Sequence, residues 1–147
     1  MTTTDDAPVT TRVPLRLRLS DPDRPQPLDG GWWPQTRDLS VEMADLVDHF
    51  PAETGRIVRA VYSPPDWDDA PKRVTTARGY IETAAVPRDP TPVIMLTTSD
   101  RRKLCLVVIP AEFSAAEGEA ALEAAVTPYF ATSPAKLLEK VTEDSRA

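Results

Sequence analysis

Apolar and polar residues alternate near the N-terminus, between Arg12 and Leu19. In an extended chain four apolar side chains would lie on one side, with Arg16 and Arg18 on the other. A period of two over this length predicts a half-buried β-strand. Pro14 has no N–H to donate, so we expect the strand at a sheet edge or beginning near this residue.

Next along the chain, between residue 38 or 40 and residue 50, the apolar residues recur at the spacing of a helix. Asp38 or Ser40 can cap the N-terminus of this predicted helix, and Pro51 ends it. Glu42 lies with other acids on the opposite face, which we expect to be solvated.

Two more helix starts lie near the C-terminus. Ser114-Ala-Ala-Glu117 is a capping box that predicts a helix at about 115–126. Ser133-Pro134 offers a capping serine and a proline at the first helical position. A short C-terminal helix can therefore follow, to about residue 143.

The other apolar segments predict strands at 56–63, 72–77, 80–86, 93–98 and 103–109. The last two flank a polar turn and are apolar at successive positions, which indicates strands covered on both faces or curled into a barrel. No connection in this block has room for a crossover helix, so antiparallel pairing is favoured. The sequence thus predicts an α+β fold, with an antiparallel, strongly curved sheet of about five to six strands and two main helices.

Three regions are expected along the chain: a flexible tail at 1–11, a single α+β domain at 12–126, and a C-terminal extension at 127–147. No apolar segment reaches the roughly 18 residues that span a bilayer. The N-terminus also lacks the basic and apolar regions of a signal peptide. A cytoplasmic protein with no membrane contact is therefore expected.

The composition then excludes several classes of function. The 147 residues include 17 Lys and Arg against 23 Asp and Glu, a formal net charge of −6. This balance disfavours a general nucleic-acid binder, because phosphate contacts need clustered basic residues. One cysteine and one histidine cannot form an internal disulfide or a Cys/His zinc site. No cofactor, metal or catalytic residue is predicted.

Individual reactive side chains have ordinary structural interpretations. His49 falls near the end of the predicted first helix, where a surface histidine is expected. Cys105 lies in an apolar strand and is expected to be a small buried side chain. Residues 66–69 resemble the start of a calcium loop, but Pro71 and Ala77 stand where an EF-hand needs Gly and Glu. A magnesium site on two of these carboxylates is the alternative.

Three tryptophans lie in proline-rich segments that we expect to be loops: Trp32, Trp33 and Trp67. Two adjacent side chains of an extended chain face opposite sides, so one tryptophan should pack inward and the other be partly exposed. Tryptophan is both a common core residue and a frequent binding anchor. If the two loops meet at one end of the sheet, they form a rigid aromatic and acidic surface. Its predicted binding residues are Asp29, Trp32, Trp33, Arg37, Asp38, Trp67 and Asp68.

Three functions are compatible with these features. The leading hypothesis is a non-enzymatic binding or regulatory module that contacts a protein partner or small ligand through an exposed Trp32 or Trp33. A small hydrolase or ligand-binding enzyme would instead use loop carboxylates as acid, base or metal ligand, from Asp29, Asp66 or Asp68. A weak single-stranded nucleic-acid binder would use Arg16, Arg18, Arg101 and Arg102.

The double-tryptophan segment at residues 28–39 resembles a family of uncharacterised actinobacterial proteins. Their pattern is an Arg-Leu-x-Leu strand, then Leu-Asp-Gly-x-Trp-Trp-Pro-x-[Ser/Thr]-Arg-Asp-Leu, a Trp-Asp-x-x-Pro segment and a late apolar strand ending in Pro. The matching residues here are Arg16–Leu19, 28–39, Trp67–Pro71 and Ile109-Pro110. The resemblance covers about residues 12–126 and implies a domain of unknown function with no established activity.

Overall fold

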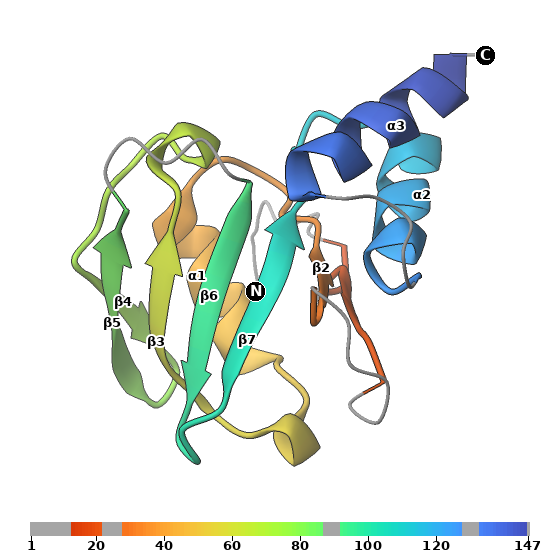
Figure 1. Cartoon of the computed structure of the whole chain (residues 1–147). Helices are drawn as coiled ribbons and strands as arrows, with labels where there is room; N and C mark the ends of the chain where they lie inside the picture. Colours follow the sequence, from red (N-terminus) through yellow and green to blue (C-terminus); the bar gives the residue numbers. More distant parts are fainter. Residues whose placement is uncertain (1–12, 22–27, 87–91, 128–132, 147) are drawn as a thin grey trace, which may run out of the picture.

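The computed structural model describes residues 13–21, 28–86, 92–127 and 133–146, which form a sheet with helices on both faces (Figure 1). The strands are β1 (Leu17–Leu19), β2 (Gly30–Trp32), β3 (Ile57–Tyr62), β4 (Arg73–Thr76), β5 (Gly79–Ala85), β6 (Val93–Thr98) and β7 (Lys103–Val108). The helices are α1 (Leu39–Asp48), α2 (Ala115–Ala125) and α3 (Pro134–Arg146), with short 3-10 turns η1 (Ala52–Thr54) and η2 (Pro64–Asp66). The predicted tail at 1–11 lies outside the described residues.

The sheet is mixed and open, with the order β1-β2-β7-β6-β3-β5-β4. β2 runs parallel to β7 and β3 runs parallel to β5, whereas the other four pairs are antiparallel. The prediction of an antiparallel, strongly curved sheet of five to six strands was therefore wrong. The β3–β5 pair needs no crossover helix, because the chain passes to the sheet edge as β4 and returns through a hairpin into the space beside β3.

The additional strand is β2, in a segment predicted to be a loop. Asp29-Gly30-Gly31 has the composition of a turn, but the backbone there pairs with β1 on one side and β7 on the other. The two glycines suit this crowded position: a Cβ at Gly31 would lie only 2.8 Å from the Cβ of Ala125, and Gly30 has a φ of 157°. Trp32 consequently lies in a strand rather than in a loop.

The three predicted helices are all present, and local capping explains where they begin. Asp38 caps α1 by accepting from the Val41 N–H, and Ser114 with Glu117 forms the capping box of α2. The Ser133 hydroxyl oxygen accepts from the Lys136 N–H at the start of α3. Within the described ranges, none of the helices is long and apolar enough to cross a membrane.

Two apolar cores lie on opposite faces of the sheet. α1 covers one face over a large core that includes Trp32, Leu46 and Tyr62. α2 packs on the other face near β1 and β2, with α3 packed against it, and this smaller core includes Trp33 and Leu137. Figure 1 shows α2 and α3 together at the β2 side, so they cover only part of their face.

The central hairpin shows the effect of this partial cover. In β7, Leu106 and Val108 join the large core, while Val107 joins the small one, so the end of this strand is covered on both faces. In β6, Leu96 is buried but Met95 is 36% exposed. The expectation of cover on both faces holds only for the second half of β7, from Leu106 to Val108, and fails for β6, because α2 does not reach that far across the sheet.

Candidate functional site

All three tryptophans are buried. Trp32 (1% exposed) stacks against Trp67 (5%) in the large core, with ring centroids 5.5 Å apart. Trp33 (5%) lies on the opposite face beneath α2, and the Arg16 guanidinium covers its ring at 3.6 Å. The two neighbours do face opposite sides, as predicted. The expectation that one would be partly exposed was wrong, because α2 and Arg16 cover the second face.

We expect the intrinsic tryptophan fluorescence to be blue-shifted and poorly quenched by acrylamide. All three indoles are at most 5% exposed, so neither water nor quencher reaches them in the folded chain. Steady-state emission spectra and Stern–Volmer plots, before and after unfolding in urea, measure this directly. A red-shifted emission that acrylamide quenches readily in the native protein would contradict the buried arrangement and restore the exposed anchor.

The two predicted loops do meet at one end of the sheet. The Arg37 guanidinium donates to the Asp68 carboxylate at 2.9 Å and to the Pro65 carbonyl at 2.8 Å, and the Asp68 N–H donates to the Arg37 carbonyl. This hydrogen bond to Asp68 raises the pKa of Arg37. The exposed side chains of the predicted surface are charged, namely Arg37, Asp38 and Asp68. Its role in binding stays a prediction.

Asp69 fastens these loops to α1, a role that the sequence did not indicate. Its carboxylate accepts from the Leu39 and Ser40 N–H groups, at 2.7 and 3.2 Å, and from the Ser40 hydroxyl at 2.8 Å. Partial burial raises the pKa of Asp69, but these hydrogen bonds outweigh that effect and leave the pKa below its usual value. The first turn of α1 thus has a second acceptor besides Asp38.

The carboxylates of the predicted hydrolase do not share one set of partners. Asp29 exchanges hydrogen bonds with Cys105 in β7, where its carboxylate accepts from the Cys105 N–H at 2.7 Å. Asp68 is paired with Arg37, as described above.

The other reactive side chains show no sign of a catalytic site. Burial is the main cause that raises the pKa of the Cys105 thiol, and the negative charge of the nearby Asp29 adds to it. The raised pKa disfavours the reactive thiolate. His49 is exposed at the end of α1, as expected. Over the described ranges, no group of three or more potential metal ligands occurs.

Most arginines of the nucleic-acid alternative have partners inside the protein. Arg16 donates to the carbonyls of Trp33 and Pro34. Arg18 forms ion pairs with Glu119 and Glu123 on α2. Arg102 donates to the Thr54 carbonyl and lies 3.6 Å from Asp100. With the tryptophans buried, this alternative also lacks exposed indoles on which bases could stack.

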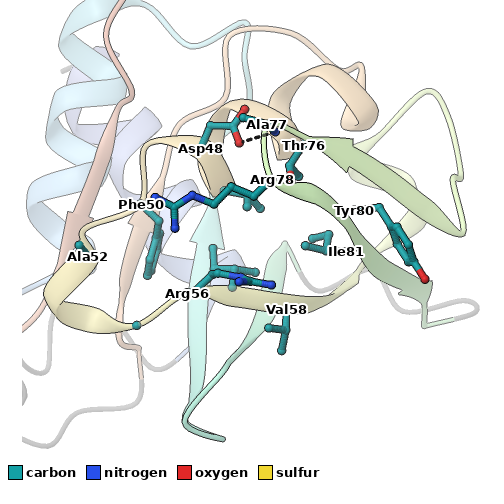
Figure 2. Close-up of a pocket in the computed structure, with 13 residues that line it drawn as sticks. Asp48, Phe50, Ala52, Arg56, Val58, Thr76, Ala77, Arg78, Tyr80 and Ile81 are labelled. Carbon is teal, nitrogen blue, oxygen red and sulfur yellow. Dashed lines mark hydrogen bonds between the residues drawn. The ribbon is translucent and has the colours of Figure 1, made fainter.

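A different site lies between the C-terminal end of α1, the η1 turn, the start of β3 and the β4–β5 turn (Figure 2). It is a pocket of about 310 Å³, which we call the arginine pocket. Its apolar wall includes Val47, Phe50, Ile57 and Ile81, and its charged residues are Asp48, Arg56 and Arg78. Figure 2 shows Arg78 extending from the β4–β5 turn toward Phe50, and Arg56 extending from the start of β3 toward Val58.

Local backbone features shape this pocket. A bulge between Ile57 and Arg59 shifts the pairing of β3 with β6 at the point where β3 begins. Asp48, at the end of α1, accepts from the Ala77 N–H at 3.0 Å and so fixes the β4–β5 turn against the helix (Figure 2). Gly79, with a φ of 134°, completes that turn. This β4–β5 turn carries Arg78, which lines the pocket.

The two arginines of the pocket lack side-chain partners among the residues that the structure describes. Other described arginines are paired with carboxylates, carbonyls or rings, namely Arg16, Arg18, Arg37, Arg59, Arg73 and Arg102. Arg101, at the tip of the β6–β7 hairpin, likewise has no side-chain partner among the described residues, but it is not part of the lining of the arginine pocket. Arg56 and Arg78 are therefore distinctive in combining available guanidinium groups with an apolar cavity.

Comparison with known proteins defines the family and nothing finer. No curated protein and no solved structure matches the chain. Residues 16–125 match the model of a family of unknown function (DUF5994). Since this match covers well over half of the sequence, the chain belongs to that family of unknown function.

Proposed function

We propose that this protein is a non-enzymatic binding module whose ligand is a small molecule in the arginine pocket. The observation that carries the proposal is a cavity of about 310 Å³ with an apolar wall and two guanidinium groups at its opening. Ligand sites typically have this size and combine apolar walls with a few polar groups that orient the ligand. The leading hypothesis from the sequence, a binding module, is kept, but its site moves away from the tryptophans.

Binding is favoured over catalysis by the kind of groups that line the pocket. His49 and Cys105 are not part of its lining. A guanidinium stays protonated in proteins, so Arg56 and Arg78 supply charge and donors but not a general base. The Asp48 carboxylate is already an acceptor for the Ala77 N–H, a contact that shapes the pocket.

An NMR titration tests the proposal. We expect small amphipathic fragments, with 3-phenylpropionate, 3-phenylpropan-1-ol and 3-phenylpropylamine as the set, to give saturable shifts in ¹H–¹⁵N spectra of the full chain. The shifts should concentrate on backbone amides of residues 47–58 and 76–81, which include the pocket lining. Ala52→Trp places a large side chain at the pocket and should weaken these shifts. The matched control Ala70→Trp, at an exposed position outside the lining, should not.

Two outcomes would contradict the proposal. One is the lack of saturable shifts at the pocket with all three fragments. The other is a set of shifts scattered over the sheet and helices that Ala52→Trp leaves unchanged. In either case the cavity would be a packing feature of the region where α1 meets the β4–β5 turn.

A further inference from the structure

We infer that the ligand of the arginine pocket is a small organic acid, with one carboxylate on an apolar body. This inference rests on the proposed function and adds the chemical class of the ligand. It follows from three features of the pocket: the sign of its charge, the separation of its apolar and charged parts, and the origin of its arginines on two different elements.

The sign of the charge favours an anion with one negative charge. Arg56 and Arg78 against Asp48 leave one net positive charge on the lining, in a chain whose formal net charge is −6. Apolar walls strengthen the interaction with a bound ion, because they lower the local dielectric constant. A second negative charge on the ligand would face the Asp48 carboxylate.

The geometry of a guanidinium suits a carboxylate in particular. Its planar set of N–H donors matches two carboxylate oxygens, and it loses less hydration on binding than an ammonium group. Arg56 comes from the start of β3 and Arg78 from the β4–β5 turn, so the lining offers a carboxylate two separate guanidinium groups (Figure 2). The Asp48–Ala77 hydrogen bond holds the turn that carries Arg78.

The apolar wall specifies the remainder of the ligand. Ile57 and Ile81 are nearly buried, at 1% and 4% exposed, so the apolar surface that a ligand can cover comes from partly buried residues of the lining such as Val47 and Phe50. An inorganic anion would leave this surface hydrated, whereas a hydrocarbon body would remove it from water, at about 25 cal/mol per Å² of apolar area. The arrangement therefore favours an acid with an aromatic or branched aliphatic body over a free phosphate or sulfate.

The same three fragments test the inference, because they share one apolar body and differ in charge. We expect 3-phenylpropionate to bind about tenfold more tightly than 3-phenylpropan-1-ol, as one charge-assisted hydrogen-bond pair supplies roughly this factor. The amine should bind no better than the alcohol, and inorganic phosphate should bind more weakly than the acid. Dissociation constants come from the shifts of the pocket amides.

Three substitutions locate the effect. Arg56→Gln and Arg78→Gln should each reduce the affinity for 3-phenylpropionate about five- to tenfold while leaving the affinity for the alcohol unchanged. Arg101→Gln is the matched control, because Arg101 is also exposed and without a partner among the described residues, but lies outside the pocket. It should change neither affinity. Native ¹H–¹⁵N spectra of each variant verify that it is folded.

The outcomes separate this inference from the proposed function. If none of the three fragments binds at the pocket, the proposed function fails. If the alcohol or the amine binds there as tightly as the acid, or if both Gln variants keep full affinity for the acid, only the organic-acid inference fails. If phosphate binds as tightly as 3-phenylpropionate, the apolar part of the inference is overturned.

Discussion

Replacing Gly118 by alanine is expected to destabilise the protein by about 2 to 3 kcal/mol. In an exposed helix the same change usually stabilises by about 1 kcal/mol, because glycine loses more backbone freedom on folding. Gly118 is buried in α2, and a Cβ at this position would overlap the six-membered ring of Trp33. Either the indole or the helix must move, so the packing cost exceeds the gain in helix propensity.

Urea unfolding of Gly118→Ala measures this cost as a change in the free energy of unfolding. Ala120→Gly is the matched control at an exposed position of α2, where alanine should be the more stable residue by about 1 kcal/mol. Trp33→Leu removes the ring that the new methyl group meets, so the double variant should lose less than the sum of the single changes. A Gly118→Ala protein as stable as the natural one would show that α2 does not sit on Trp33 as described.

Replacing Glu42 by alanine is expected to cost about 2 to 4 kcal/mol of unfolding free energy. Glu42 is 1% exposed, and its carboxylate accepts from the Gln35 N–H at 2.9 Å and from the Thr36 hydroxyl at 2.8 Å. Alanine would leave both donors without this acceptor and would open a space beside α1. Glu42 therefore fastens the connection between β2 and α1 to the helix from within the core.

Chemical denaturation of three variants tests this role of Glu42. Glu42→Gln keeps the volume and an acceptor oxygen, so it should lose less than half as much as Glu42→Ala. Glu53→Ala changes an exposed glutamate of η1 and should stay within about 0.5 kcal/mol of the natural protein. If Glu42→Ala were equally mild, the carboxylate would have to be solvated, as the pattern of the helix predicts.

The elements with local signals could be predicted from the sequence. Asp38, the capping box at Ser114 and the Ser133-Pro134 pair each satisfy backbone groups within one helical turn, so nearby residues suffice to indicate where the helices begin. The β4–β5 and β6–β7 hairpins are equally local. The sequence left open whether the two tryptophan segments meet, and the ion pair of Arg37 with Asp68 joins them.

Features that depend on distant partners could not be predicted in this way. Gly30 and Gly31 have turn composition, and only β1 and β7 beside them make the segment a strand. The charge of Glu42 predicts a solvated position, but Leu39 and Leu46, three and four positions away, lie on the same side of α1, and the preceding loop folds back over the carboxylate. In the same way, the exposure of Trp33 depends on α2, which lies more than eighty positions later.

The arginine pocket had no signal in the sequence. Arg56 precedes a strand and Arg78 lies in a hairpin turn, and both positions ordinarily hold solvated arginines. Only the parallel pairing of β3 with β5 brings the two segments to the same end of the sheet. A motif search cannot find such a site, because its residues are neither adjacent nor regularly spaced.

The pairing of β2 with β7 also constrains the order in which the chain can fold during its synthesis. Gly30 pairs with Leu106 and Trp32 with Val108, so β2 and β1 cannot join the sheet until residue 108 has left the ribosome. Until then Trp32 and Trp33 have no finished core to enter, although the β4–β5 hairpin and the pairing of β3 with β6 can already form. The N-terminal strands are thus made first and incorporated late, and such non-local closure is slow in folding. A nascent chain of this protein must keep its two tryptophans soluble for most of its own translation.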